Sequence, residues 1–568
     1  MLSVGKLSNM AITQYRTLAS YVVLLTVGIV NLIIIPDKSI DPINSPKLFA
    51  LGAFGLLSLF IVVQLLIKNP SHFKEAHFIT ALLLILQLTV VMISSGRFED
   101  QFYGVFGRNT GYLALLSLIA LLLSASVVRT QKFVEGLTKV LIACGFLAIA
   151  YGLLQVLGLD PVTWGASGYK PVFGFLGNPN FESAFLGMTG SAFLAFAISK
   201  KVKMQVRFLY IIGILVSGFV ILKSESEQGF LVLISGSLTV VLVYLYSIKN
   251  KSLLLLSFVF SVGLGLISIL GLTNRGPLAG ILYKDSIQFR GDYWRAAWKM
   301  GFENPLTGVG IDRFGENYRG YRDLLATTRR GPDVTSNSAH NVFLDVFSNT
   351  GFIGAGLYIS LNLLTVVAII RFLRSNSDYK IPFTALTSAW IAYVAQSIIS
   401  VNQLGLAVWG WALMGAIIGL SLSPGNQGFT DSNQKQKKTP QNNQDKLLPG
   451  TLLKAYIVIA VGAIISIWPL ASDVSYMNAL KSGNATKIQE IVYARPLTSQ
   501  KSFDVANILL ENKFEKESLQ VIRDSVKTFP NTFELWRIMS IQPGATSVEV
   551  AEANRQMKRL DPLNPELK

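Results

Sequence analysis

The sequence has little charge and almost no cysteine. Only 15% of its 568 residues are charged, whereas 51% are hydrophobic, and its single cysteine, Cys144, lies in an apolar segment. One cysteine cannot form an intrachain disulfide, so a secreted disulfide-stabilised fold is excluded. A soluble protein of this length normally carries much more charge. The composition therefore indicates a polytopic membrane protein.

Long apolar segments define the expected architecture. Each is long enough to cross a hydrocarbon layer of about 30 Å as a helix. We predict an all-α protein with about 12 core transmembrane helices, a 13th span and a small extracytoplasmic helical domain. The predicted spans are residues 21–35, 47–67, 77–95, 111–128, 136–158, 181–199, 208–222, 229–247, 252–272, 349–370, 382–402, 404–422 and 452–471.

The positions of the basic residues indicate the orientation of the chain. With a cytoplasmic N-terminus, the short cytoplasmic connections hold thirteen lysines and arginines and the opposite ones hold six. This difference agrees with the positive-inside rule. Much of the net charge of +17 is thus a topology signal, and we expect no nucleic-acid partner. The expected location is the bacterial cytoplasmic membrane, with the C-terminal tail extracytoplasmic.

Four regions are expected along the chain. Residues 1–423 form the membrane domain, 424–450 a flexible polar cytoplasmic linker, 451–471 the thirteenth span and 472–568 a helical tail. In the tail, Pro496, Pro530 and Pro562 recur at nearly the period of tetratricopeptide repeats. An irregular helical hairpin is the alternative, because the Trp, Gly and Tyr signature of that repeat is missing.

The extracytoplasmic loop, residues 273–348, is rich in arginine. It holds eight arginines but only two lysines, together with eight carboxylates. Because a guanidinium can grip phosphate oxygens with two donors, this preference favours an anionic ligand, in particular a pyrophosphate. The alternative is a solvated loop in which the arginines pair with local aspartates.

A helix with an aromatic face is expected early in this loop. Within residues 285–305, Arg290, Trp294 and Trp298 stand four apart and therefore share one face. Such a face suits the lipid interface and a ligand with a lipid tail. A plain interfacial anchor helix explains the same pattern.

His340 is the candidate general base. Among three histidines it alone falls in the expected extracytoplasmic part, where the arginine-rich loop returns to the membrane. Transfer of a sugar from a lipid pyrophosphate to a hydroxyl needs a base for that acceptor hydroxyl. A neutral imidazole can deprotonate it near pH 7, while fixed cations stabilise the departing diphosphate. No zinc-type cluster and no nucleotide-binding glycine pattern occurs, so we expect neither a metal nor another cofactor.

Three stretches resemble the O-antigen ligase and polymerase family, the lipid-linked glycan transferases of bacterial envelopes. The first contains the family's loop motif, the second a histidine signature before a late membrane helix and the third an outward Asn-Pro-Asn. In this sequence they are Phe289-Arg290 to Tyr293-Trp294 with Asn304-Pro305-Leu-Thr-Gly308-Val-Gly310, Phe314 and Tyr318; His340-Asn341 with Gly351 and Gly354; and Gly177-Asn178-Pro179-Asn180.

The resemblance implies an inverting glycosyltransferase of the all-helical C-type fold. It implies an undecaprenyl-pyrophosphate-linked glycan as donor, with His340 as the base and Arg290 as the pyrophosphate-binding arginine. Arg108, in Gly107-Arg108-Asn109-Thr110-Gly111, is a further donor-site candidate. Many members have Ser-Arg-Gly where this chain has Ser226-Glu227-Gln228-Gly229, which leaves the second phosphate contact open. The other substrate-binding candidates are Asn180, Gln228, Arg295 and Asn341.

Several functions are compatible with this sequence. Within the family, the chain could be an O-antigen ligase, an O-antigen or exopolysaccharide polymerase or a protein O-oligosaccharyltransferase, with a lipid, glycan or protein acceptor. A polysaccharide transporter is disfavoured, because the spans are nearly free of ionisable residues. The tail is a candidate surface for envelope protein partners, but an anchored scaffold alone does not need twelve spans.

Overall fold

The computed structural model describes residues 4–162, 164, 172–282, 285–375, 378–423 and 447–567. The chain is 78% helical, and the described residues contain no β-strand. Each predicted span coincides with one long helix, which confirms an all-α polytopic membrane fold. These helices are α1 (Val4–Leu32), α2 (Asn44–Lys68), α3 (Ala76–Ser94), α5 (Tyr112–Val128), α6 (Gln131–Val156), α7 (Pro179–Ala197), α8 (Met204–Lys223), α9 (Glu227–Ser247), α10 (Lys251–Leu272), α15 (Val342–Ser375), α16 (Ile381–Ile399), α17 (Leu404–Ser421) and α18 (Pro449–Lys481).

Ten of these helices are long and apolar enough to cross a membrane. The other three, α5, α7 and α16, are shorter or less apolar, and most of their side chains are buried inside the bundle. Large apolar side chains are exposed on α8, α10, α15 and α18. A belt of exposed apolar residues on long helices is what a lipid-facing surface requires.

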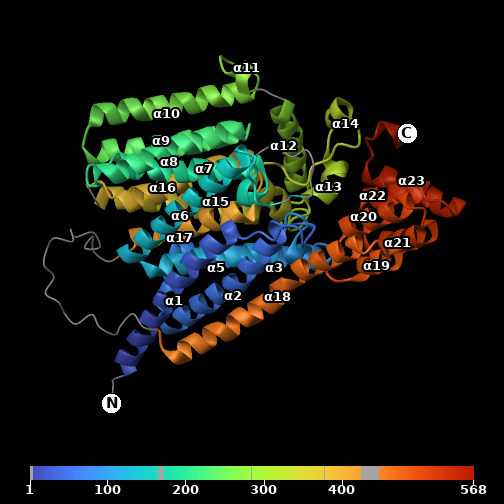
Figure 1. Cartoon of the computed structure of the whole chain (residues 1–568), viewed down its shortest axis with the longest axis horizontal. Coiled ribbons are helices and arrows are strands. Elements are labelled where there is room, and N and C mark those ends of the chain that lie inside the picture. The colour runs from blue at the N-terminus through green and yellow to red at the C-terminus, as the bar shows by residue number, and fades with distance from the viewer. Residues whose placement is uncertain are drawn as a thin grey trace.

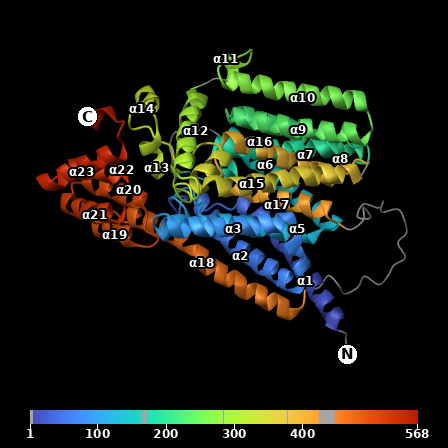
Figure 2. The same ribbon diagram turned by 180° about the vertical axis from the view of Figure 1, so that it is seen from behind.

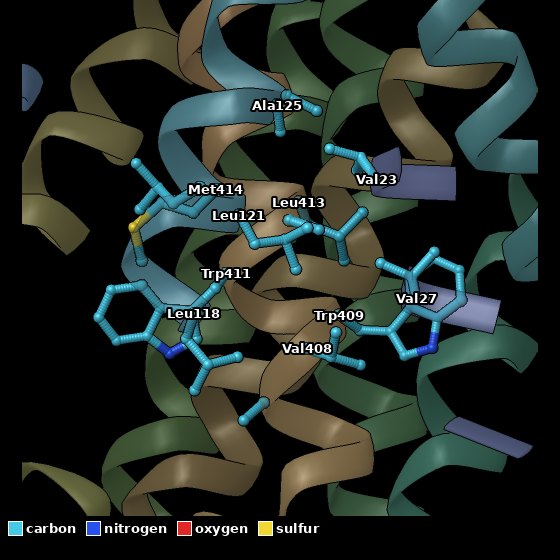
Figure 3. Close-up of a cluster of buried hydrophobic side chains, with 14 of the residues drawn as sticks. Val23, Val27, Leu118, Leu121, Ala125, Val408, Trp409, Trp411, Leu413 and Met414 are labelled. Carbon is cyan, nitrogen blue, oxygen red and sulfur yellow. The ribbon is translucent and has the colours of Figure 1, made fainter. Parts of the chain in front are cut away.

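The centre of the bundle is built from α1, α5 and α17. Figure 3 shows side chains of these helices in contact, among them Val23, Leu121 and Trp409, all fully buried. Two glycines allow α17 to lie directly on α5. A Cβ added at Gly415 would stand 2.1 Å from the Leu122 carbonyl oxygen, and one at Gly419 would be equally obstructed. Small residues at such crossings are typical of membrane helix pairs.

Helix α18 lies along α2 and continues into the tail. Ser466 donates a hydrogen bond to the Phe49 carbonyl (3.0 Å), and Gly52 leaves room for the Ser466 side chain. The helix reaches Lys481, ten residues beyond the predicted end of the span at residue 471. The thirteenth span and the first turns of the tail are therefore one continuous helix.

The tail is helical, as predicted. Its core joins Tyr476 and Ala479 of α18 to buried residues such as Val505, Ile522 and Leu535. The prolines that suggested a repeat precede or follow helices, and the assignment to tetratricopeptide repeats stays a prediction. The tail elements are α19 (Ala485–Glu490), η4 (Ile491–Tyr493), α20 (Ser499–Glu511), α21 (Glu515–Thr528), α22 (Phe533–Ile541), α23 (Ser547–Leu560) and η5 (Pro565–Leu567).

The connections gather at the two ends of the bundle as the topology requires. At the end that carries the tail, Asn44 donates to the Gly107 carbonyl (2.7 Å) and accepts from Gln403 (3.3 Å). At the other end, Glu75 pairs with Arg129. Figures 1 and 2 show the tail and the N-terminus at opposite ends. We call the first the tail-side end. Most of the predicted linker, residues 424–446, lies outside the described residues.

Short helices complete the connections. The arginine-rich loop forms α11 (Ala279–Leu282), α12 (Asp285–Glu303), α13 (Phe314–Tyr321) and α14 (Leu324–Arg330), and it ends where α15 begins at Val342. Between α3 and α5 lies α4 (Phe98–Tyr103), while η1 (Pro70–Lys74) and η2 (Gly174–Leu176) are single turns. Figure 1 shows α12, α13 and α14 at the tail-side end, between the bundle and the tail.

Candidate active site

Helix α12 is held against the rest of the loop by a small apolar core. Its buried side chains contact α13 and the segment before α15, and the core consists of Tyr293, Ala296, Ala297, Met300, Phe314, Tyr318 and Ala339. The Tyr293 and Tyr318 rings meet edge to face at 5.5 Å. This packing fixes the orientation of α12, and hence of the other side chains that the helix carries.

The opposite side of α12 exposes aromatic rings beside α15. Trp298 and Phe302 are 49% and 59% exposed, and their rings stack at 5.4 Å. Phe302 also meets Phe352 of α15 (5.3 Å). Exposed aromatic rings next to a membrane helix are typical of the lipid interface. Only part of the predicted aromatic face of α12 is exposed, because Trp294 is half-buried while Trp298 is exposed.

The two glycine motifs of the sequence meet at a break in α15. Gly351 has φ 70° and ψ −169° there, and the Phe352 amide donates to the Pro305 carbonyl (2.8 Å). The Val309 amide donates to the Ser348 carbonyl (2.8 Å). A Cβ at Gly351 would lie 2.4 Å from the Pro305 oxygen, so only glycine fits. The loop is thus docked onto α15 at Ser348 to Phe352, soon after His340 in the chain.

A buried carboxylate shapes the turn that presents His340. Asp345 accepts hydrogen bonds from the Ser338 hydroxyl (2.5 Å) and the Ala339 amide (2.7 Å). The His340 amide donates to the same hydroxyl (3.0 Å), and His340 has a left-handed φ of 51°. A non-glycine residue adopts this conformation only when its surroundings hold it. Asp345 is therefore a positioning residue for the histidine.

The surroundings of the His340 imidazole favour its neutral form. It stacks on Tyr293 with ring centroids 5.6 Å apart. Burial lowers the pKa of His340 to about 4, and the positive charges of Arg290 and Arg108 contribute. In the described part of the chain, neither ring nitrogen has a hydrogen-bond partner. The ring can therefore accept a proton from a bound molecule.

Arg290 is a half-buried cation for which the described residues offer no hydrogen-bond or ion-pair partner. It lies one turn before Tyr293 on α12 and is close enough to His340 to influence that residue's pKa. Its guanidinium makes no hydrogen bond or ion pair with any described residue. Burial lowers the pKa of Arg290, but an arginine remains charged in proteins. A desolvated, uncompensated guanidinium is costly unless an anion joins it.

Most other arginines of the loop are paired with carboxylates. Arg295 reaches Asp292 (2.5 Å) and Asp323 (2.6 Å), and Arg329 also reaches Asp292 (3.1 Å). Arg313 pairs in the same way with a glutamate on the next turn of its helix. For these arginines the alternative interpretation holds: they form local ion pairs with carboxylates, and these pairs stabilise the loop. Arg295 is engaged in two ion pairs and does not present a free charge.

Arg108 lies between two carboxylates, and all three side chains line one pocket. Its guanidinium is 3.6 Å from Asp312 and 4.0 Å from Asp345, and it donates to the Asn337 carbonyl. The pocket is walled by side chains of α3, α5, α15 and α17, including Leu84, Leu88, Leu115, Ile119, Val346, Tyr358 and Trp411. His340 stands beside this pocket and does not line it.

The remaining candidates are occupied or lie elsewhere. Asn341 accepts from the Leu344 amide (3.1 Å) and so caps α15. Asn180 accepts from the Ser226 hydroxyl (2.8 Å), and the buried amide of Gln228 has no partner within the described residues. No contact given by the described residues joins Asn180 or Gln228 to His340. The structure therefore brings His340, Arg290 and Arg108 near one another, while Asn341 and Arg295 lie close by with their side chains already engaged.

Sequence reasoning missed Asp312 and Asp345, and it named Tyr293 only as part of the loop motif, without its contact with His340. Two of them had a recognisable signal. Asp345 falls in the first turn of a helix, where a carboxylate is favoured, and Tyr293 is three residues from Arg290 on a helix. Asp312 accepts from the Val105 amide (2.9 Å), a contact across 207 residues of sequence that no local pattern announces.

These features define a multi-pass, all-helical membrane protein with an arginine–histidine site at one end of its bundle. Residues 212–359, which include α12, His340 and the break in α15, match the family model described as O-antigen ligase. This match supports an assignment to the O-antigen ligase and polymerase family, which the resemblance predicted. It does not extend to the tail. No curated protein matches the chain.

Proposed function

We propose that the protein transfers an oligo- or polysaccharide from undecaprenyl pyrophosphate to an acceptor hydroxyl. The family match supports a transferase activity of the ligase or polymerase type. The reaction takes place at the outer face of the cytoplasmic membrane, where the tail-side end of the bundle lies. The distribution of basic residues supports this orientation.

In the proposed reaction, His340 takes the proton of the acceptor hydroxyl as its oxygen attacks the anomeric carbon of the donor sugar. The bond from that carbon to the diphosphate oxygen breaks, and the diphosphate leaves with both bonding electrons. Arg290 stabilises the negative charge that develops on the leaving group. Attack from the face opposite the diphosphate inverts the anomeric configuration. Because guanidinium supplies the positive charge, the reaction needs no metal.

The pocket beneath Arg108 suits the lipid end of the donor. Many of its lining side chains are apolar residues of four membrane helices, and its polar part holds Arg108 together with Asp312 and Asp345. A prenyl diphosphate likewise joins an apolar chain to a polar head. The exposed rings of Trp298 and Phe302 would rest at the lipid interface beside the entrance.

The carrying observation is that Arg290 and the imidazole of His340 are near each other and that neither has a hydrogen-bond or ion-pair partner among the described residues. The charge of Arg290 and the ring nitrogens of His340 are largely desolvated, so both groups are ready to bind a ligand. The test is transfer by the purified full-length protein from a synthetic polyprenyl-diphosphate glycan, with the product's anomeric configuration read by NMR. We expect an inverted product in the presence of EDTA. A retained configuration, or activity that EDTA abolishes, would refute the mechanism.

The acceptor decides between ligase, polymerase and protein O-oligosaccharyltransferase. Lipid A core, a second lipid-linked repeat and a peptide should therefore be offered in parallel. A transporter is the alternative from another class. It would move the lipid-linked glycan across a vesicle membrane without forming a new glycosidic bond, so the same donor in proteoliposomes separates the two functions.

A further inference from the structure

A buried ion cluster joins the tail to the arginine-rich loop. Asp561, which follows α23, accepts from Arg322, the residue after α13 (2.6 Å), and from Arg319 of α13 (3.1 Å). The side chains of Arg322 and Asp561 are completely buried. Glu534 of α22 also pairs with Arg319 (3.0 Å), and the Arg319 guanidinium lies over the Phe533 ring. Arg319 and Arg322 therefore hold the tail against the arginine-rich loop, two regions that are far apart in sequence.

The same two arginines hold the backbone that leads to the histidine. Arg322 donates to the carbonyls of Pro332 (2.8 Å) and Val334 (3.2 Å), and Arg319 also donates to that of Pro332 (2.8 Å). The tail carboxylate thus orients two guanidiniums whose other donors fix the segment after α14. We call residues 331–338 the bridging segment.

The bridging segment ends in the candidate active site. The carbonyl of Asn337 accepts from Arg108, and Ser338 bonds both to Asp345 and to the His340 amide. An uninterrupted series of hydrogen bonds and chain segments therefore runs from Asp561 to His340. No part of the tail has to touch the substrate for this series to operate.

We propose that the tail is a positioning element of the transfer site. Asp561, acting through Arg319 and Arg322, holds the bridging segment so that His340 and Arg108 keep their places. This inference rests on the proposed function, because it assigns the tail a role in that reaction. Asp561 is a positioning residue, since it touches neither donor nor acceptor.

Neutralising Asp561 should release the bridging segment. Asp561→Asn keeps the size of the side chain but leaves Arg322 buried with no carboxylate in contact. A buried charge that loses its partner is strongly unfavourable, so the guanidinium should leave its place and its carbonyl contacts. Small displacements of catalytic groups lower the rate steeply while binding contacts elsewhere survive.

The test compares Asp561→Asn with Arg495→Gln in the full-length protein. Arg495 also links the tail to the membrane domain, through Glu99 (2.9 Å), but it does not contact the bridging segment. Hydrogen–deuterium exchange of residues 331–341 and of α21 is measured together with kcat and KM for transfer. For Asp561→Asn we expect faster exchange in residues 331–341 alone and a kcat lower by about tenfold or more, with KM for the donor nearly unchanged. Arg495→Gln should match the wild type in each measurement.

Three results would overturn the positioning role. The first is wild-type exchange in residues 331–341 of Asp561→Asn. The second is an equal rise of exchange throughout α21, which would mean that the cluster only stabilises the tail. The third is a normal kcat although exchange in residues 331–341 is faster. Failure of the proposed function looks different. In that case His340→Ala would transfer glycan normally, while the effect of Asp561→Asn on exchange would persist.

Discussion

Replacing Arg290 by glutamine should abolish most glycan transfer while leaving the fold intact. Arg290 makes no ion pair in the described structure, so its removal breaks no internal contact of that kind. Each hydrogen bond between a charged group and its partner contributes about 1.5–3 kcal/mol. Two such bonds to the diphosphate give about 3–6 kcal/mol, or a rate loss of about 10²- to 10⁴-fold. Arg290→Lys keeps the charge but loses the two-pronged geometry, so it should recover only part of the rate.

The assay is transfer by purified variants under single-turnover conditions with a synthetic polyprenyl-diphosphate donor. Arg329→Gln is the matched control, since that arginine lies in the same loop but pairs with Asp292. We expect the control to stay within about threefold of the wild type, because partly exposed ion pairs contribute little. Transfer by Arg290→Gln within about threefold of the wild type would refute the assignment of Arg290 to the diphosphate.

Three further predictions follow from the geometry. Because the pKa of His340 is lowered to about 4, kcat/KM should fall on the acid side near pH 4. The acid-side fall of kcat should lie at higher pH, because the bound diphosphate offsets the charges of the nearby arginines. Falls of kcat and kcat/KM at the same pH would contradict this expectation. Gly351→Ala should lower the thermal midpoint markedly, with a stability loss of about 2 kcal/mol or more, whereas an unchanged midpoint would refute the need for glycine. Trp298→Ser with Phe302→Ser should weaken binding to lipid vesicles and raise the donor KM more than it lowers kcat; an unaltered KM would remove these rings from the lipid interface.

The membrane helices were predictable because hydropathy is a local property of the sequence. Every predicted span overlaps one helix and runs past its end by no more than three residues, although α1 and α15 begin earlier and α18 ends later than predicted. Hydropathy marks the part of a helix that lies in lipid, whereas the helix continues wherever its backbone bonds remain satisfied. The ends of α18 and α15 depend on packing against the tail and the loop, which no window of hydropathy measures.

The site was predictable only in part. Motif and residue type singled out His340 and Arg290, and the structure brings them together. Which loop arginine lacks a carboxylate could not be read from the sequence, because partners such as Arg322 and Asp561 lie 239 residues apart. The aspartate that shapes the histidine turn was likewise hidden, since its role depends on a turn that forms only in the fold.

The most direct test of the central claim is the transfer rate of His340→Gln measured alongside binding of the lipid-diphosphate donor. A general base typically contributes about 10²- to 10⁴-fold to the rate. We therefore predict donor affinity close to that of the wild type and a transfer rate lower by at least about 100-fold. A variant that binds the donor and transfers the glycan at nearly the wild-type rate would contradict the account.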